Sequence, residues 1–248
     1  AHNRTEHLLD DLRLVRERLE APRWLVVGGS WGATLALAHA AFEPQAVAAL
    51  LLRAVFLPQA GDIEDFFQDT TARAPDAWAR FASAVPADHR HDMLAYLAQG
   101  LQEPVTGSDA DLPRRLAFAW WQWERTLAGG QPLSSAEPQP DRETLDALVD
   151  RYRVQSHYLL HRCWLDSPPL LDRLDVLPQV PTLLLHSRDD RICRPEGAQA
   201  VHERIAHSQL RWVNGAGHDP SHPAMASAMV AALDSYAAHG HFGSEPMP

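Results

Sequence analysis

The chain has 248 residues and a formal net charge of −10, from 22 basic and 32 acidic side chains. This length supports one domain or one domain with a sizeable insertion, and the acidic balance without a separate basic cluster argues against a nucleic-acid partner. The longest apolar stretches are broken by Gly, Pro or charge before they reach the roughly 20 apolar residues of a membrane span, so no membrane partner is expected.

The first part of the chain, residues 1–57, favours an α/β architecture. Apolar residues recur at helical spacing over 5–20, and a short buried strand is predicted at 23–29. A helix at 31–42 and a second buried strand at 46–56 follow. A strand, a helix and a strand at this spacing predict a parallel sheet.

Between residues 58 and 167 the pattern changes to helical periodicity without a convincing strand. This segment holds most of the tryptophans, several Pro and Gly breaks, and the loop-like sequence GGQPLSSAEPQPD at 129–141. We interpret 58–167 as a helical cap inserted between the two parts of an α/β core.

The second part of the core is expected over 168–248. Its predicted strands lie at 180–187 and 209–213. Its helical segments are expected at 170–177, around 195–206 and at 222–238. The tail at 240–248 is expected to be disordered.

Residues 28 to 32, Gly-Gly-Ser-Trp-Gly, fit the G-x-S-x-G motif between a buried strand and an amphipathic helix. The glycines are expected to let the backbone turn sharply without a Cβ clash, so that the Ser30 hydroxyl stands exposed above the end of the strand. Backbone N–H groups at the start of the next helix, such as that of Trp31, would face negative charge that develops there. Ser30 is therefore the predicted nucleophile, and a purely structural turn is the alternative.

A serine nucleophile needs a base, and the base needs a carboxylate to orient it. Asp189 and Asp190 follow the strand predicted at 180–187, and His218 follows the strand at 209–213. Open α/β sheets place their sites at these carboxyl ends of the strands. His218 is the expected base, with an ordinary loop histidine as the alternative, and spacing alone leaves the acid open between Asp189 and Asp190.

No metal and no cofactor are expected. His157 with His161, and His218 with His222, have i,i+4 spacing, but neither an HExxH motif nor a Cys/His set accompanies them. The two cysteines are too few for a disulfide framework and no secretory signal is recognisable, so we expect reduced thiols in a cytoplasmic protein.

The elbow and the two loops that follow it resemble those of the proline iminopeptidases, serine peptidases of the α/β-hydrolase superfamily. The likeness covers most of the chain and is carried by the segments HNRTEHLLDDLRLVRERL, WLVVGGSWGATLALAHA, HSRDDRICRP and GAGH. It implies the α/β class with an α/β-hydrolase-type parallel sheet, of which only the later strands are present, and a helical cap insertion. It also places Asp190 on the family's aspartate and Asp189 on its tyrosine.

The segment AWWQWERT at 119–126 resembles the part of the family's cap in which a Trp-Glu pair supplies a carboxylate to the free amino terminus of the substrate. The resemblance gives that role to Glu124, with Trp123 beside it, because a carboxylate next to tryptophans offers charge and an apolar wall for a proline ring. A helix-surface glutamate is the alternative. Gln155 stands where the family has a second glutamate, and its amide carries no charge, so weaker amine binding or a shifted selectivity is expected.

The family's His-Gly-Gly-Pro-Gly loop, which supplies one oxyanion donor, is not found in this sequence, and neither are the strands before the elbow. The Trp31 N–H is then the identifiable donor, and losing one donor costs about a hundredfold to a thousandfold in rate. The strand at 24–28 would form a hydrophobic edge. We therefore expect a truncated fragment, a sequence that was assigned too late a start, or a decayed homologue rather than a complete enzyme with a new oxyanion device.

The expected function is that of a serine exopeptidase, which releases N-terminal proline or a similar small residue from a peptide or small amide through an acyl-enzyme. Two alternatives stay open. The first is an esterase or amidase that acts on neutral substrates, and the second is an inactive homologue or interaction module. The sequence does not determine the oligomeric state.

Overall fold

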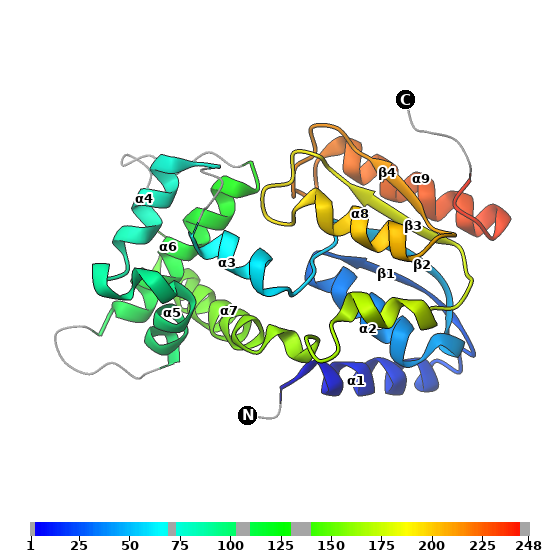
Figure 1. Ribbon diagram of the computed structural model, residues 1–248, viewed down its shortest axis with the longest axis horizontal. Coiled ribbons are helices and arrows are strands. Elements are labelled where there is room, and N and C mark those ends of the chain that lie inside the picture. Colours follow the sequence, from blue (N-terminus) through cyan, green and yellow to red (C-terminus); the bar gives the residue numbers. More distant parts are fainter. Residues whose placement is uncertain (1–2, 69–72, 103–109, 130–139, 244–248) are drawn as a thin grey trace. The chain divides into compact units, whose positions relative to one another are not determined.

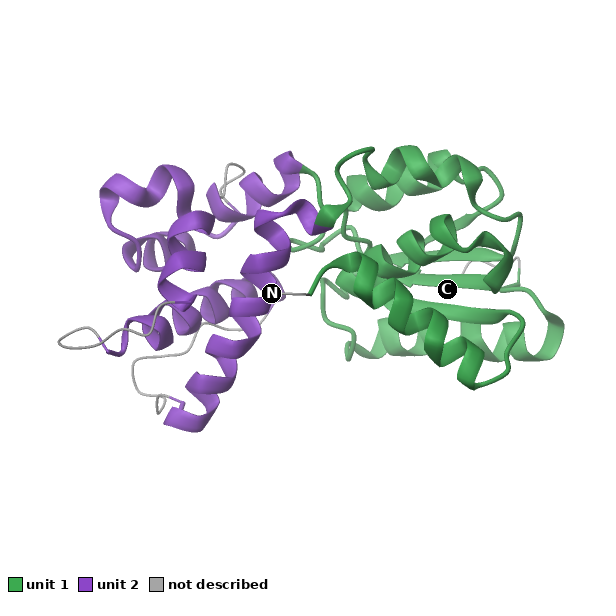
Figure 2. Cartoon of the chain, turned by 90° about the horizontal axis from the view of Figure 1, so that it is seen from below, with its two compact units in different colours: residues 1–59, 164–248 green, residues 60–163 purple. Residues whose placement is uncertain are grey.

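Two units make up the chain in the computed structural model, and each is described by itself (Figure 2). Unit 1 holds residues 1–59 and 164–248, and unit 2 holds residues 60–163. The structure describes residues 3–68, 73–102, 110–129 and 140–243. The limits of unit 2 lie within a few residues of those of the helical insertion expected from the sequence.

Unit 1 is built on a parallel sheet with the strand order β1-β2-β3-β4 (Figure 1). The strands are Trp24–Gly29 (β1), Val47–Arg53 (β2), Thr182–His186 (β3) and Gln209–Trp212 (β4). The two central strands are buried almost throughout, because each has a strand on both sides and helices on both faces. Among the described strands β1 pairs with β2 alone, and Val27 in β1 is 46% exposed. The expected α/β class with a parallel sheet is confirmed.

Helices cover both faces of this sheet. Helix α9 (Pro223–His239) packs its small and apolar residues against alternate side chains of β2 and β3. Helix α2 (Trp31–Phe42) lies along β1, and a run of buried alanines on α2 permits this close packing. The other helical segments of unit 1 are α1 (Thr5–Arg18), η1 (Pro44–Ala46), η4 (Leu170–Val176) and α8 (Pro195–Arg204), and η3 (Arg162–Trp164) joins the units.

Unit 2 is helical, and its described residues contain no strand, as the periodicity predicts. Its helices are α3 (Ala60–Gln68), α4 (Pro75–Ser83), η2 (Ala87–Asp92), α5 (Met93–Gln102), α6 (Leu112–Leu127) and α7 (Arg142–Leu160). Aromatic rings on α3, α4, α6 and α7 pack edge to face or stack to form its core. Unit 2 therefore has a hydrophobic core of its own.

The expected disorder of the tail is wrong for residues 240–243. Gly240 ends α9 with a φ of 74°, in the left-handed conformation that glycine adopts without strain. Phe242 is 2% exposed and stacks on Tyr236, and Arg211 donates to the carbonyls of Phe242 and Gly243 at 2.7 Å. Residues 244–248, and most of the loop expected at 129–141, lie outside the described residues.

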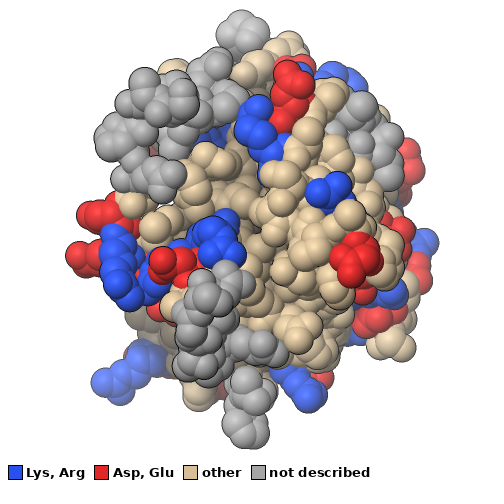
Figure 3. Space-filling view, turned by 90° about the vertical axis from the view of Figure 1, so that its left-hand side faces the viewer, with Lys and Arg blue, Asp and Glu red and all other residues tan. Residues whose placement is uncertain are grey.

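On the face that Figure 3 shows, the described residues form no basic patch. Acidic and basic side chains of the described residues lie there interspersed among uncharged ones. No helix in the part of the chain that the structure describes is long and apolar enough to cross a membrane.

Candidate active site

Ser30 lies at the carboxyl end of β1, in the turn that leads into α2. Its φ of 56° and ψ of −123° place it in a region that costs a non-glycine residue about 1–3 kcal/mol. Its N–H donates to the Arg53 carbonyl at 2.9 Å, and its own carbonyl accepts from Ala33 at 3.0 Å. The sharp turn therefore strains the serine itself, and hydrogen bonds to β2 and α2 hold it there.

The glycines before Ser30 are required by close contacts rather than by unusual φ angles. A Cβ on Gly28 would overlap the backbone of Gly32, which passes directly over it. A Cβ on Gly29 would lie 2.7 Å from Nη2 and 2.8 Å from Nε of Arg53. Only glycine fits at these two positions without a shift of the neighbouring groups.

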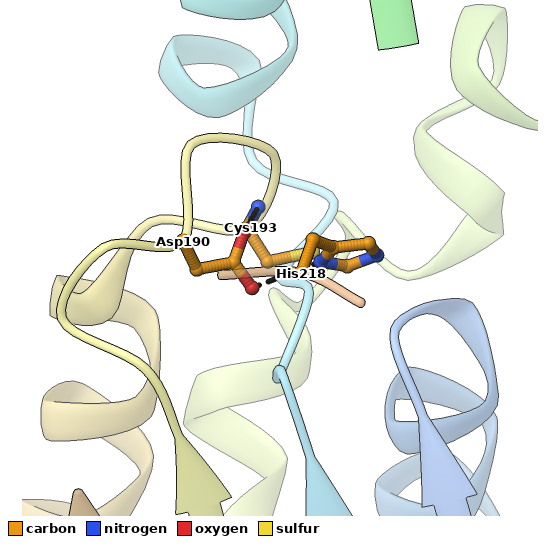
Figure 4. Close-up of side chains that lie close together, drawn as sticks. All are labelled: Asp190, Cys193 and His218. Atoms are coloured by element: carbon orange, nitrogen blue, oxygen red, sulfur yellow. Dashed lines mark hydrogen bonds and ion pairs between the residues drawn. The ribbon is translucent and has the colours of Figure 1, made fainter. Parts of the chain in front are cut away.

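Asp190 and His218 meet beyond the ends of β3 and β4 (Figure 4). The Asp190 side chain is fully buried, and its Oδ2 lies 2.9 Å from Nδ1 of His218. Its Oδ1 accepts the backbone N–H groups of Ile192 and Cys193, each at 2.9 Å. Because the carboxylate accepts, we assign the proton to Nδ1, which leaves the lone pair on Nε2. The pair has the geometry of an imidazole base oriented by a carboxylate.

The Asp189 side chain has different hydrogen-bond partners from the Asp190 side chain. Its Oδ2 accepts the N–H of Gly215 at 3.0 Å, and the nearby Ser187 Oγ accepts the N–H of Gly217 at 3.1 Å. Both contacts brace the loop that carries His218. The geometry thus separates two aspartates that spacing alone could not distinguish.

The Ser30 hydroxyl is paired with a thiol in this structure. Its Oγ lies 3.7 Å from Sγ of Cys193, and no hydrogen bond joins Ser30 to His218, both of which are described. Polar atoms of Cys193, Asp190 and His218 lie within 4.8 Å of one another (Figure 4), so the thiol next to the Ser30 hydroxyl is also close to the imidazole and its carboxylate. A hydrogen bond between nucleophile and base is often long until a substrate is bound.

Thiolate, imidazole and carboxylate are also the ligand types that zinc prefers. The Asp190 carboxylate, however, already accepts three hydrogen bonds. The Arg53 guanidinium interacts electrostatically with both Asp190 and Cys193 and would oppose a divalent cation. The cluster is better suited to proton transfer than to metal binding.

Two buried side chains that the sequence analysis did not single out support this site. Arg53 is 8% exposed, and its Nη1 donates to the His218 carbonyl at 2.9 Å. Burial lowers the pKa of Arg53, and the charges of Cys193 and Asp190 oppose that shift. Burial also lowers the pKa of His186, whose neutral ring donates from Nε2 to the Cys193 carbonyl at 2.9 Å. The sequence does contain a signal for these two residues, because each is a polar residue that ends an apolar strand: Arg53 ends β2 and His186 ends β3.

In unit 2, Glu124 and Gln155 are hydrogen-bonded to each other. Oε1 of Glu124 accepts from Nε2 of Gln155 at 2.6 Å and from Nε1 of Trp120 at 3.1 Å. Oε2 accepts from the Tyr152 hydroxyl and from Nη2 of Arg151, each at 2.9 Å. The Glu124 side chain is 12% exposed. It is therefore a largely buried carboxylate with four donors and not a helix-surface glutamate.

Trp123 is placed differently from what its position next to Glu124 suggested. It is 1% exposed, its Nε1 donates to the Phe66 carbonyl at 3.1 Å, and its ring stacks on Phe81. No exposed ring surface supports a contact with substrate. Neighbouring residues of a helix point about 100° apart, so the tryptophan on the Glu124 face is Trp120, four residues earlier.

Comparisons with known proteins identify the family to which this chain belongs. Residues 1–223 match the family model of the α/β hydrolase fold. The chain is 32% identical over 239 residues to the probable proline iminopeptidase of Leptolyngbya boryana, a match that covers 95% of this chain and 72% of that protein. The chain belongs to the α/β-hydrolase family, among the proline iminopeptidases.

Other proline iminopeptidases give similar values. Identity is 31% to the protein of Xylella fastidiosa strain Temecula1, over 95% of this chain and 74% of that one. It is also 31% to the protein of Arabidopsis thaliana, over 93% of this chain and 60% of that one. The expected family and the expected class, an aminopeptidase-like serine hydrolase, are confirmed. The chain spans only part of the length of each of these proline iminopeptidases.

Solved structures agree with this family on the fold. Esterase E22 aligns with a TM-score of 0.59 at 15% identity, over 94% of this chain and 66% of that one. A carboxylesterase of Nitrososphaera gargenis aligns with a TM-score of 0.55 at 17% identity, over 95% and 72%. At identities this low the likeness shows the α/β-hydrolase fold alone.

Proposed function

We propose that this member of the proline iminopeptidases is a serine exopeptidase that releases N-terminal proline, or another small residue, from peptides or small amides. The observation that supports this most is the 2.9 Å contact between the buried Asp190 and His218, beside the strained turn at Ser30. A buried carboxylate that orients an imidazole next to a strained serine is what acyl transfer requires.

In the proposed reaction, Ser30 Oγ attacks the scissile carbonyl while Nε2 of His218 takes its proton. Asp190 stabilises the imidazolium that forms. The N–H of Trp31, at the N-terminus of α2, donates to the developing oxyanion. His218 returns the proton to the leaving amine, and a water molecule then hydrolyses the acyl-enzyme by the same steps.

An exopeptidase also has to hold the substrate's cationic amino terminus, and we assign this role to Glu124. A carboxylate binds an ammonium through charge-assisted N–H bonds. Trp120, Tyr152 and Gln155 support the assignment, because their hydrogen bonds fix the orientation of the carboxylate.

The charge around Glu124 favours a second candidate, an esterase or amidase for neutral substrates. Arg151 forms an ion pair with Glu124 at 2.9 Å, and Gln155 adds no charge. The carboxylate and its four partners therefore carry no net charge. Such a site would not require an ammonium group on the substrate.

Fluorophosphonate labelling of the purified chain, followed by hydrolysis of proline arylamide and N-acetylproline arylamide, separates these functions. We expect labelling that is lost in Ser30→Ala, and at least tenfold faster turnover of the free amine. Equal rates on both arylamides would favour the neutral-substrate hydrolase. A folded protein that is not labelled would contradict both and indicate an inactive homologue.

A cytoplasmic location is also part of the proposal. It is supported by Cys163 and Cys193, which are both buried free thiols. Burial raises the pKa of Cys163 to about 12, so this thiol stays protonated and unreactive.

A further inference from the structure

We infer that Arg151 occupies, on Glu124, the place that the proposed function gives to the substrate's amino group. This arginine then sets the selectivity between substrates with and without a free amine. The inference rests on the proposed function, because that function makes Glu124 the amine-binding carboxylate.

The four donors to Glu124 differ in charge. Trp120, Gln155 and Tyr152 are neutral donors, and Arg151 is the one cation among them. Its Nη2 donates an N–H to Oε2 at 2.9 Å, which is the kind of contact that a substrate ammonium would make. Arg151 and an incoming amine would thus compete for the same carboxylate oxygen.

The donors to Glu124 also differ in exposure to solvent. Trp120 and Tyr152 are completely buried and stack on each other, with ring centroids 4.6 Å apart. The Arg151 side chain is 55% exposed, and among the described residues its contact besides Glu124 is with the Tyr152 ring, whose centroid lies 5.2 Å from the guanidinium carbon. Arg151 can therefore move into solvent while the remaining donors keep Glu124 in place.

Displacement of Arg151 has a modest cost, because its half-exposed guanidinium regains water and three neutral donors still bond to the Glu124 carboxylate. This cost weakens the binding of a substrate with a free amine, whereas a neutral substrate leaves the ion pair intact. Without Arg151, the carboxylate would keep three neutral donors and an uncompensated negative charge. Such a carboxylate attracts an ammonium more strongly.

The test compares Arg151→Gln with the wild type on proline arylamide and on N-acetylproline arylamide. We expect the KM for the free amine to fall about two- to fivefold, the range of an exposed ion pair, with kcat unchanged. The kinetics of the acetylated substrate should not change. Arg153→Gln is the matched control, because Arg153 lies on the same helix and bonds to Asp150 and the Leu101 carbonyl instead of Glu124. Arg153→Gln should have the KM and kcat of the wild type on both arylamides.

Calorimetric titration with prolinamide gives a readout that does not depend on turnover. Tighter binding to Arg151→Gln than to wild type supports the inference, and equal or weaker binding overturns it. Glu124→Gln tests the proposed function separately. If that variant binds prolinamide more weakly than the wild type, Glu124 remains the amine site whatever Arg151 does. If Glu124→Gln binds as the wild type does, or no variant binds, the proposed amine site and the inference both fail.

Discussion

Asp190 shows how a single buried residue fixes the chemistry of its neighbour. Its two oxygens accept three hydrogen bonds, two from the backbone and one from His218. The backbone bonds lock the carboxylate in one orientation, so the imidazole has one favourable tautomer. The side chain of Asp189, the preceding residue, accepts instead from the backbone N–H of Gly215.

Asp190→Asn is expected to lower kcat on the arylamide by about a thousandfold to ten-thousandfold, because an amide group favours the wrong tautomer of His218. Steady-state kinetics would measure the loss. Asp189→Asn is the control and should keep most of the activity, since an amide oxygen can still accept from Gly215. Similar losses in both variants would argue against a distinct role for Asp190.

Gly29→Ala is expected to destabilise the fold by about 1–3 kcal/mol, because the added methyl group would press on the Arg53 guanidinium. The displaced Arg53 would also lose its bond to the His218 carbonyl. Urea unfolding would give the change in free energy. Gly32→Ala is the matched control, since a Cβ there meets nothing within 4 Å. The explanation fails if both variants are equally stable.

At the scale of elements, α2 and β1 are joined by a buried polar contact as well as by apolar packing. Nε1 of Trp24 donates to Nε2 of His39 at 3.1 Å, and the two rings meet edge to face. His39 is completely buried, and burial lowers its pKa, while the charge of Glu43 acts in the opposite direction. His39 therefore belongs to this interface as a neutral ring.

The lowered pKa values of His39 and His186 predict that the fold loses stability in acid. The unfolded chain takes up these protons near pH 6.5, and the folded chain takes them up only at lower pH. The free energy of unfolding should thus fall as the pH drops below about 6.5. Urea unfolding at neutral and mildly acidic pH measures this slope.

His39→Gln should have a shallower slope than the wild type, because one of the two buried imidazoles is gone. His207→Gln, at an exposed histidine, should keep the full slope. A wild-type stability that does not change over this range would contradict the burial argument.

Most elements could be predicted from the sequence because their signals are local. The apolar runs of β1 and β3 and the periodicity of α2 and α9 need no knowledge of distant residues. The order along the chain of the loops proposed to carry the nucleophile, the acid and the histidine follows from the same patterns. The segment 170–177 is less regular and forms the 3₁₀ helix η4.

Features that depend on tertiary contacts could not be predicted in this way. Phe242 is ordered because it packs on Tyr236, which the tail sequence does not reveal. Trp123 offers no surface to a substrate because its ring is buried against Phe81 of α4 and its Nε1 donates to the Phe66 carbonyl of α3. Arg151 was missed because its role exists only when α7 lies beside α6.

At the scale of the whole molecule, the two units differ in the number of chain segments that form them. Unit 2 is one continuous segment, whereas unit 1 combines residues 1–59 with 164–248. The aromatic core of unit 2, with Phe81, Trp120 and Trp123, lies entirely within its own segment. Unit 2 thus has what an independently folding domain requires.

Residues 60–163 expressed alone are expected to be helical and to unfold cooperatively, because their core is complete. Far-ultraviolet circular dichroism and a thermal melt would test this. Trp123→Ala in the same fragment should lose about 3–5 kcal/mol and abolish the cooperative transition. A wild-type fragment with the spectrum of an unfolded chain would show that unit 2 depends on unit 1.

The discontinuity of unit 1 has a consequence during synthesis on the ribosome. Ser30 leaves the exit tunnel well before Asp190 and His218, and β3 and β4 can join the sheet only after the whole insertion has been made. The insertion can fold while the first segment still waits for its partner strands. The nascent chain therefore carries the proposed nucleophile without the proposed base, and hydrolysis can begin only after the loop with His218 has left the tunnel and β4 has joined the sheet.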